Sequence, residues 1–297
     1  MIERTSEEPK LHVIRRIREL AAHREILLNL VRKELKVKYT ASVLGAVWSL
    51  LNPVVFLAVF SFVVVVTGNA LPHYPVYLLS GLLAWNLFSN SLLQGARSVV
   101  DNGNLVKKVS FPREVLPLAS IGVTLVDFVL QSAVLLLFVV VSGYGFRIGT
   151  LWLYPLAILT LLVFTAALTF WVAGLNVRYR DVQHLLNLGL LVWFWLTPIV
   201  YQGALVQTYL EGKSNALWNV FLLNPLALIV FGFQRALYAV VTWHGAGLPA
   251  DGVHVLPEVS VGWLAGMLAL ALSASLLLLA FTWRMFFRLS GDFAEEL

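Results

Sequence analysis

Few residues in this sequence have the types and spacing that catalysis or metal binding requires. A Gly-Lys-Ser triplet stands at 212–214, but a phosphate-binding loop needs its first glycine five residues before the second, and that position holds Gln207. The six histidines are scattered without metal-ligand spacing, the sequence contains no cysteine, and no GxSxG nucleophile motif occurs. We therefore expect no enzyme active site in this chain and no bound nucleotide, metal or other cofactor.

Aromatic residues, at 12% of the sequence, indicate a different chemistry, in which flat rings cover the C–H faces of sugars. Several stand in pairs at helical spacing, in the dense run 193–195, or near the expected end of an apolar segment. One interpretation is a belt at the membrane surface together with packing against lipid. The other is a channel for a neutral glycan, whose lining rings are Phe56, Phe60, Tyr77, Trp85, Phe88, Trp193, Phe194, Trp195 and Tyr201.

Two ionisable residues, Asp127 and Arg235, stand inside otherwise apolar segments. Such residues cost several kcal/mol at the centre of a bilayer and therefore need a partner. We expect Asp127 to bond to a hydroxyl or a basic side chain at a contact between helices. Arg235 is expected to extend its long side chain to the outer interface. Two residues are too few for a proton relay.

The composition predicts that a membrane must position these residues. Hydrophobic residues make up 59% of the chain and charged residues 12%, and the mean hydropathy is +0.82. These values exclude a soluble enzyme, a disordered protein and a disulfide scaffold. A membrane-spanning helix needs about 20 apolar residues. The fold class is therefore an all-α polytopic membrane protein, with six predicted spans at 43–66, 75–96, 115–142, 151–175, 184–203 and 260–283.

Basic residues predict the orientation of these spans. Residues 1–42 are rich in Lys and Arg, and so are the segments 97–114 and 176–183 and the tail after 283. By the positive-inside rule all four segments are cytoplasmic, so both termini face the cytoplasm of a plasma membrane. No cleaved secretory signal is expected at the start. The net charge of +5 is explained by the Lys and Arg residues of these cytoplasmic segments. It gives no reason to expect nucleic acid as a partner.

The apolar stretch 217–243 is interrupted by Pro225 and Arg235, and its flanks are poor in basic residues. We interpret 204–255 as a gate region at the outer face, in which a pair of short helices broken at Asn224-Pro225 enters the membrane and returns. Irregular backbone at membrane depth requires protein or a wet cavity around it. The alternative is an ordinary seventh span with an external C-terminus, against which Arg284 and Arg288 argue.

The cytoplasmic segments carry a pattern of their own. Residues 11–28 place apolar side chains on one arc and basic ones opposite, which predicts an amphipathic helix at the membrane interface within an N-terminal segment 1–42. The alternative is a solvated basic arm. Asp181 is a candidate N-cap for the fifth span and can also meet Arg178 or Arg180. The loops 97–114 and 176–187 are either plain connections or short docking helices. Residues 43–297 form a single membrane domain.

Five motifs in sequence order resemble one known family. Residues 32–39 (RKELKVKY) and 44–53 (LGAVWSLLNP) are similar to the opening of type-2 ABC exporter permeases, in particular those that export polysaccharides of the O-antigen, teichoic-acid or galactan type. The later motifs are 111–113 (FPR), 176–182 (NVRYRDV), 224–226 (NPL) and the tail from Phe287 to Leu297. Each motif is weak alone, but the five occur in the correct order over nearly the whole chain.

This resemblance implies a homodimer of six-span subunits that works with two copies of a separate cytoplasmic ABC ATPase. The substrate implied is a lipid-linked glycan, taken from the inner leaflet and moved outward by ATP hydrolysis in the partner. Coupling to the ATPase then falls to Lys107, Lys108, Arg178, Arg180 and Asp181. The diphosphate of the lipid carrier would meet Arg15, Arg16, Arg32 and Lys33, and the gate would include Asn224, Pro225 and Arg235.

Three alternative functions stay open on the sequence alone. A secondary transporter predicts interrupted helices at matching places in both halves, whereas one interrupted segment is evident here. A membrane enzyme that transfers glycans needs acidic residues on an external loop, where Asp251 and Glu258 stand without partners. A drug or lipid exporter of the same family would share all the motifs. A neighbouring gene for an ATPase together with glycosyltransferase genes would favour glycan export.

Overall fold

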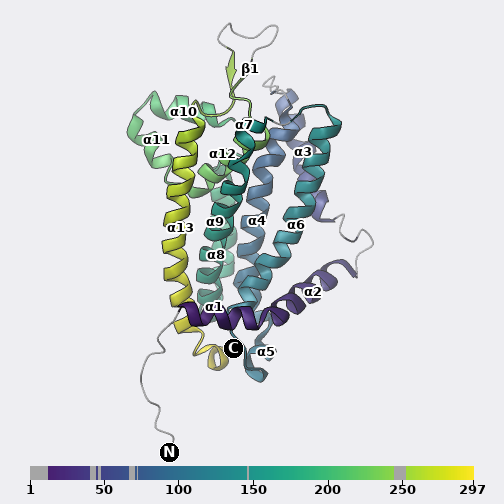
Figure 1. The fold of residues 1–297 in the computed structure, drawn as a ribbon, viewed down its shortest axis with the longest axis vertical. Coiled ribbons are helices and arrows are strands. Elements are labelled where there is room, and N and C mark those ends of the chain that lie inside the picture. The colour runs from purple at the N-terminus through teal and green to yellow at the C-terminus, as the bar shows by residue number, and fades with distance from the viewer. Residues whose placement is uncertain are drawn as a thin grey trace, which may run out of the picture.

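The computed structural model of the chain describes residues 13–40, 45, 48–66, 71, 73–145, 147–243 and 252–297, most of them in helices (Figure 1). The elements are α1 (Val13–Ala22), α2 (Arg24–Thr40), α3 (Trp48–Val66), α4 (Tyr74–Asp101), α5 (Gly103–Lys108), α6 (Val115–Val141), α7 (Ile148–Leu151), α8 (Leu153–Arg178), α9 (Val182–Trp195), α10 (Gly203–Glu211), α11 (Asn215–Phe221), α12 (Pro225–Leu237), β1 (Thr242–Trp243), β2 (Val253–His254), α13 (Val261–Leu289) and α14 (Phe293–Glu296). The predicted helical membrane fold is confirmed.

Five helical stretches in the described residues are long and apolar enough to cross a membrane, namely α3, α4, α6, α7 with α8, and α13. The shortest is α3, whose candidate span has 18 residues. A helix of this length is about 27 Å long, close to the thickness of about 30 Å of the hydrocarbon core of a membrane. The five stretches coincide with the predicted spans one to four and six. Residues 43, 44, 46 and 47, at the start of the first predicted span, lie outside the described residues.

The fifth predicted span, 184–203, is shorter than expected. Helix α9 has 14 residues and ends at Trp195, so it rises only about 21 Å. Pro198 explains the early end, because its ring in a continued helix would clash with the carbonyl group of Phe194. The residues after α9 are apolar but not helical, so hydropathy alone overestimated the length of this helix.

The predicted break at Asn224-Pro225 is present. Helices α11 and α12 meet there at a bend of 86°, and they count as a sixth candidate span if taken together. The Asn224 side chain caps α12 by accepting a hydrogen bond from the backbone N–H of Leu226 at 3.1 Å, and Pro225 takes the first helical position. In Figure 1, α10, α11 and α12 occupy the upper part of the molecule and do not reach its lower end. The re-entrant path itself stays a prediction, because the bent pair could also be one broken span.

The N-terminal helix differs from the prediction of one helix over 11–28. A turn at His23 divides it into α1 and α2, and the imidazole Nδ1 of His23 lies 2.7 Å from the carbonyl oxygen of Glu19. Residues 11 and 12 lie outside the described residues. Leu20 and Leu27 pack against a small apolar core around Phe286, whereas Ile14, Ile17 and Leu28 stay exposed. Helices α1 and α2 lie across the lower end in Figure 1, near α5 and α14.

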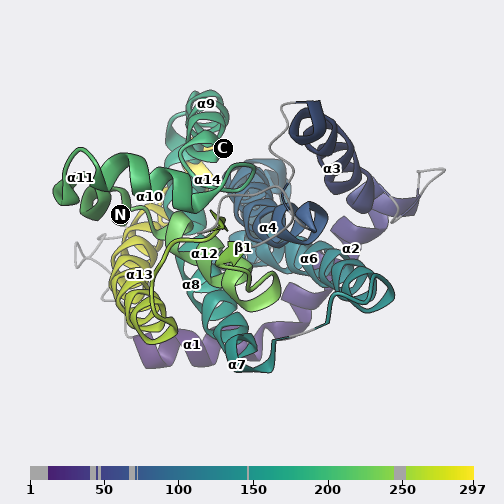
Figure 2. The same cartoon turned by 90° about the horizontal axis from the view of Figure 1, so that it is seen from above.

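The bundle surrounds two central helices. In Figure 2, α4 and α8 lie in the interior, while α3, α6, α9 and α13 stand around them, with α3 and α9 on the same side. The larger apolar core joins α4, α8, α12 and α13, and a smaller core at the lower end includes Leu30, Phe286 and Phe293. Helix α3 buries little of its surface in this subunit, whereas α4 is mostly buried.

Candidate functional site

Seven of the nine predicted channel rings lie in one continuous row of aromatic side chains. Phe56 and Phe60 of α3 stack with ring centroids 5.8 Å apart, and Phe56 meets Phe194 of α9 at 5.9 Å. Phe194 in turn contacts Trp85 of α4 at 5.3 Å. We call this the aromatic row; its members are Phe56, Phe60, Trp85, Phe88, Phe164, Trp193, Phe194 and Trp195.

Phe164 of α8 is a member of the aromatic row that the sequence did not indicate. Its ring stacks on Phe88 at 5.6 Å and lies 6.1 Å from Trp193. No spacing pattern in α8 distinguishes this phenylalanine from its apolar neighbours, because its partners come from two other helices. The row therefore joins four helices, and only the fold brings its members together.

Exposure divides the aromatic row into buried and accessible rings. Phe88 is fully buried and Phe194 nearly so, hence both pack the interior of this subunit. Trp195 is 53% exposed, and the rings of Phe56, Phe60, Trp85 and Trp193 are half-buried. Adjacent residues of α9 point about 100° apart, which explains why Phe194 is buried while its neighbour Trp195 faces outward. The accessible end of the row lies on the side of α3 and α9.

Tyr77 and Tyr201 lie apart from the aromatic row. Tyr77 is fully buried, and its hydroxyl donates a hydrogen bond to the backbone carbonyl of Tyr201 at 2.6 Å. Its ring packs edge-on against Tyr238 at 5.4 Å. The Tyr201 hydroxyl donates to the carbonyl oxygen of Trp195 at 2.8 Å. Tyr77 is thus a core residue that fastens the segment after α9 to α4, contrary to the predicted lining position.

A groove separates α9 from the break between α11 and α12. Its volume is about 730 Å³, and apolar side chains dominate its walls, among them Leu188, Leu196 and Phe221. At its edge the indole Nε1 of Trp193 donates a hydrogen bond to Oδ1 of Asn224 at 2.9 Å. A predicted channel ring and a predicted gate residue therefore touch directly.

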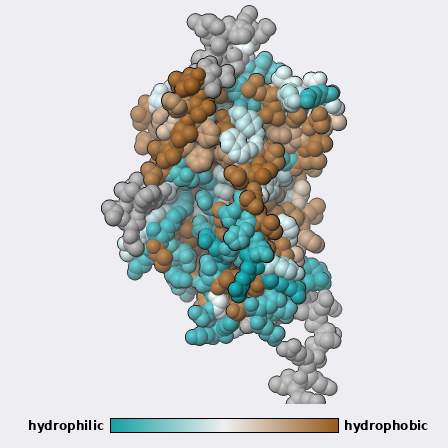
Figure 3. All heavy atoms as spheres, turned by 180° about the vertical axis from the view of Figure 1, so that it is seen from behind, coloured by the Kyte–Doolittle hydropathy of each residue, from teal (hydrophilic) through white to brown (hydrophobic). Residues whose placement is uncertain are grey.

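Helix α4 carries a polar stripe that its apolar composition did not indicate. Asn86, Asn90, Gln94 and Arg97 recur at helical spacing and so share one face of a candidate membrane span. Asn86 is buried and donates to Gln131 of α6 at 3.1 Å, whereas Asn90 and Gln94 are half-buried and Arg97 is exposed. The repeat of amides at helical spacing is a sequence signal for this stripe, although the apolar residues around it obscure the repeat. On the face seen in Figure 3, hydrophilic surface likewise extends from the lower end upward, below a mainly hydrophobic upper part.

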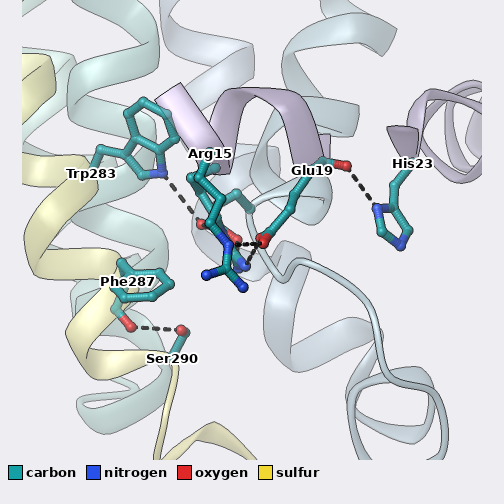
Figure 4. Close-up of polar contacts among 8 residues, drawn as sticks. Arg15, Glu19, His23, Trp283, Phe287 and Ser290 are labelled. Atoms are coloured by element: carbon teal, nitrogen blue, oxygen red, sulfur yellow. Dashed lines mark hydrogen bonds and ion pairs between the residues drawn. The ribbon is translucent and has the colours of Figure 1, made fainter. Parts of the chain in front are cut away.

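Arg16 is held in place by two carboxylates at the lower end. Its guanidinium donates to both carboxylate oxygens of the buried Glu114 at 2.7 Å, and to Glu19 at 2.8 Å. Trp283 of α13 adds a hydrogen bond from its indole to Glu114 at 3.3 Å (Figure 4). Hydrogen bonding to Glu114 raises the pKa of Arg16 against the opposing effect of burial. Arg16 therefore anchors α1 to the start of α6 and is engaged within the chain.

The other three predicted headgroup residues are more accessible. Arg15 is exposed and pairs with Glu19 at 3.2 Å on the surface of α1. Arg32 is exposed, and Lys33 lies 3.3 Å from both the Glu34 carboxylate and the side-chain oxygen of Asn102. Exposed ion pairs of this kind are weak and exchange readily. These side chains are thus available to an outside anion, unlike Arg16.

Asp127 has the partners that the sequence predicted. Nζ of Lys38 lies 2.6 Å from Oδ2 of Asp127, and the hydroxyl of Tyr39 donates to Oδ1 at 2.5 Å. The two donors stand near the end of α2, and Asp127 lies in the middle of α6. Together with Arg16 and Glu114, this contact fastens α1 and α2 to α6 at two points.

The predicted coupling residues gather at the lower end. A pocket of about 230 Å³ lies between α5, the segment after α8 and α14, and its lining includes Lys107, Arg180 and Glu296. Arg178 lies 3.7 Å from the Glu296 carboxylate. Lys108 and Asp181 are exposed. Asp181 immediately precedes α9 as predicted, but its side chain makes no capping hydrogen bond and no ion pair with Arg178 or Arg180 in the described residues.

The gate residues differ in their surroundings. Asn224 and Pro225 shape the turn before α12, as described above. Arg235 is half-buried near the end of α12, and its Nε and Nη1 atoms are buried without a hydrogen-bond partner among the described residues. That its side chain reaches the outer interface stays a prediction. Within the described part of the chain, no three His, Cys, Asp or Glu side chains are grouped as metal ligands.

Comparison with known families decides the class of protein. Residues 26–238, which extend from α2 to the end of α12, match the ABC-2 type transporter family. The chain belongs to the ABC-2 type transporter family. This match covers α3, α4 and α9, which carry most of the aromatic row, and also the gate residues Asn224 and Pro225. The family that the motifs resemble is therefore confirmed, and the match includes four of the five motifs, all but the tail from Phe287.

Proteins with a known name are similar to this chain over most of their length. The O-antigen export system permease protein RfbA of Myxococcus xanthus is 36% identical over 231 residues, which cover 76% of this chain and 85% of that protein. A protein of the same name from Klebsiella pneumoniae is 29% identical over 211 residues, or 71% of this chain and 79% of that protein. The chain is thus a multi-pass membrane protein similar to permease subunits.

Proposed function

We propose that this chain is the channel-forming subunit of an ATP-driven exporter, which moves a lipid-linked polysaccharide of the O-antigen, teichoic-acid or galactan kind out of the cytoplasm. The observation that carries the proposal is the aromatic row, whose accessible end opens on the same side as α3 and α9 in an ABC-2 family member. Flat aromatic rings contact the C–H faces of sugars and carry no net charge that would hold the polymer tightly at one place. A polymer can therefore slide past them.

The polar stripe on α4 supports a hydrated substrate. Half-buried amides such as Asn90 and Gln94 are costly against lipid and are favourable where they meet water or sugar hydroxyls. A drug or lipid exporter needs no such row of amides along a membrane helix. The identity of the relatives as O-antigen export permeases agrees with this interpretation.

A second copy of the chain is proposed to complete the channel. The outward sides of α3 and α9 carry exposed apolar residues, including Val59, Phe62, Leu188 and Leu191. Helix α3 packs little against its own subunit, so a partner copy can bury this face. Two copies that meet through α3 and α9 would enclose the accessible end of the aromatic row between them.

The lower end is proposed to receive two copies of a cytoplasmic ABC ATPase. Lys107 and Arg180 line one pocket, and Lys108 is exposed beside it on α5. Movement of the ATPase reaches α4 and α8 directly, because α5 follows α4 and Arg180 follows α8. In this proposal the nucleotide binds to the ATPase subunit, and this chain contributes no ATPase site. Both termini then lie on the cytoplasmic side of the plasma membrane.

The entry of the substrate is proposed to lie near α1 and α2. Arg15, Arg32 and Lys33 offer accessible positive charge to the diphosphate of a lipid carrier at the inner leaflet. Arg16 is excluded from this role by its contacts with Glu114 and Glu19. Its contribution is to hold α1 where the other cations can act.

Deletion of the gene tests this proposal directly. We expect lipid-linked glycan to accumulate on the cytoplasmic side and surface polysaccharide to disappear, with both restored by the wild-type chain. Mass spectrometry of lipid bound to the purified complex should then detect a glycan on a lipid phosphate. Normal surface polysaccharide after deletion, with altered drug resistance or lipid distribution instead, would favour the drug or lipid exporter.

A further inference from the structure

Arg235, near the end of α12, is a partly buried cation without an acceptor in the described part of the chain. Its Nε and Nη1 atoms are shielded from water and make no hydrogen bond with any residue that the structure describes. Removing a charge from water without a partner costs several kcal/mol. The side chain as a whole is only half-buried, so a ligand can reach it from outside. As far as residues 13–243 and 252–297 are described, the place for an anion beside Arg235 is therefore unfilled.

A second arginine adds positive charge at the same place. Arg147 precedes α7 and is exposed, and its positive charge lies near enough to repel that of Arg235. Helices α7 and α12 pack against each other at the upper end of the molecule (Figure 1). Tyr144 donates a hydrogen bond to the carbonyl oxygen of Tyr238, and their rings stack with centroids 6.1 Å apart. Each tyrosine stands three residues from its arginine, so these contacts fix the two arginine-bearing segments together.

The described acidic residues at this end have other partners. Glu211 accepts a hydrogen bond from Gln207 at 2.9 Å, and Glu258 pairs with His254 at 2.5 Å. Asp251 lies outside the described residues. No carboxylate of the described residues forms an ion pair with either arginine.

We propose that Arg235 and Arg147 form a binding site for a phosphate-class oxyanion beside the gate region. A guanidinium presents planar N–H donors that match two oxygens of such an anion, and two guanidinium groups can share it. The anion is either the headgroup of a membrane lipid or free phosphate, which present the same oxygens. The proposed site does not depend on which substrate the exporter carries. The inference therefore goes beyond the proposed function.

Thermal unfolding of the purified full chain in neutral detergent tests the site, with sodium phosphate compared against sodium chloride at equal ionic strength. Phosphate is expected to raise the Tm of the wild type by a few degrees, and Arg235→Met is expected to abolish the increase. Without phosphate, Arg235→Met should unfold at a higher Tm than the wild type, because an unpaired charge has been removed. Lys213→Met is the matched control, since Lys213 lies exposed over the ring of Tyr209, and it keeps the full increase.

Several results would overturn the site. One is an equal phosphate effect in the wild type and in Arg235→Met. Another is that, without phosphate, Arg235→Met unfolds at a lower Tm than the wild type or does not fold. Either outcome would mean that Arg235 has a partner inside the chain. Arg147→Gln, at an exposed position, must weaken the phosphate effect independently. Asp251→Asn must leave it unchanged, because a larger effect would mean that Asp251 occupies the site.

Nanodiscs separate the two sources of the anion. If the ligand is a headgroup, native mass spectrometry finds phosphatidylglycerol retained by the wild type and by Lys213→Met, but lost from Arg147→Gln. If the ligand is free phosphate, the phosphate effect on Tm persists in nanodiscs of phosphatidylcholine alone. Equal lipid retention in all variants, together with no phosphate effect, contradicts the site. None of these measurements depends on export, so their failure leaves the proposed function untouched.

Discussion

The indole of Trp193 donates a hydrogen bond of 2.9 Å to the side-chain oxygen of Asn224, which also caps α12. One amide thus joins the aromatic row on α9 to the turn that begins the last helix of the gate region. A change in the position of α9 must therefore displace this turn or break the bond. The contact is the most direct structural connection between the proposed channel and the proposed gate.

Trp193→Phe keeps a ring in the row but removes the donor to Asn224. We expect the free energy of unfolding to fall by about 1 kcal/mol, the usual net value of one hydrogen bond. Export should fall several-fold, because the gate loses its link to α9. Trp171→Phe is the control, since Trp171 is an exposed tryptophan on α8 outside the row. Unchanged export by Trp193→Phe would show that this hydrogen bond contributes to the stability of the fold and has no role in export.

Glu114→Gln tests the anchor of the N-terminal helices. The change leaves the Arg16 guanidinium without its buried carboxylate, so we expect a loss of about 3 kcal/mol in unfolding free energy. Replacing Arg16 and Glu114 together by leucine should cost less than Glu114→Leu alone, because no unpaired charge stays buried. Arg15→Gln, at an exposed site on the same helix, should leave the Tm unchanged. A small effect of Glu114→Gln, equal to that of Arg15→Gln, would refute the anchor.

Single cysteines test the proposed dimer without interference, because the chain has none of its own. Phe62→Cys on the exposed face of α3 is expected to form a crosslinked dimer with a short bis-maleimide in membranes. Leu277→Cys, equally exposed on α13, should stay monomeric, since α13 lies away from α3 and α9 (Figure 2). The opposite pattern would place the dimer interface on α13 and would remove the aromatic row from the channel.

Charge reversal tests the docking surface for the ATPase. Lys107→Glu and Arg180→Glu should each lower the stimulation of the partner ATPase several-fold and weaken its co-purification, because both line the same pocket. Lys213→Glu, at the other end of the molecule, should change neither. Lys107 and Arg180 are surface side chains, so the Tm should stay within a degree or two of the wild type. Normal stimulation in both variants would exclude this pocket as the docking site.

The sequence predicted the membrane fold well where hydropathy and helix length agree. Five spans and the break at Asn224-Pro225 follow from apolar runs and a proline at a first helical position. The length of α9 was overestimated because the residues after Trp195 are apolar without being helical. The turn at His23 was missed because an amphipathic pattern can continue across a break in a helix.

The candidate site was predictable in its residue types more than in its contacts. The aromatic pairs on α3 and α4 could be read from helical spacing, yet the burial of Tyr77 depends on Tyr201 and Tyr238, which are distant in sequence. In the same way, the carboxylates of Glu114 and Glu19 decide whether Arg16 is available, and Glu114 lies 98 positions away. Partners brought together by tertiary packing leave no local pattern.

Reconstitution into sealed vesicles tests the central claim most directly. Vesicles that contain the chain together with its ATPase, loaded with lipid-linked glycan in the outer leaflet, should move that glycan inward when ATP is added outside. Vesicles with the chain alone should neither hydrolyse ATP nor move the glycan. Transport or ATP hydrolysis by the chain without a second polypeptide would contradict the account.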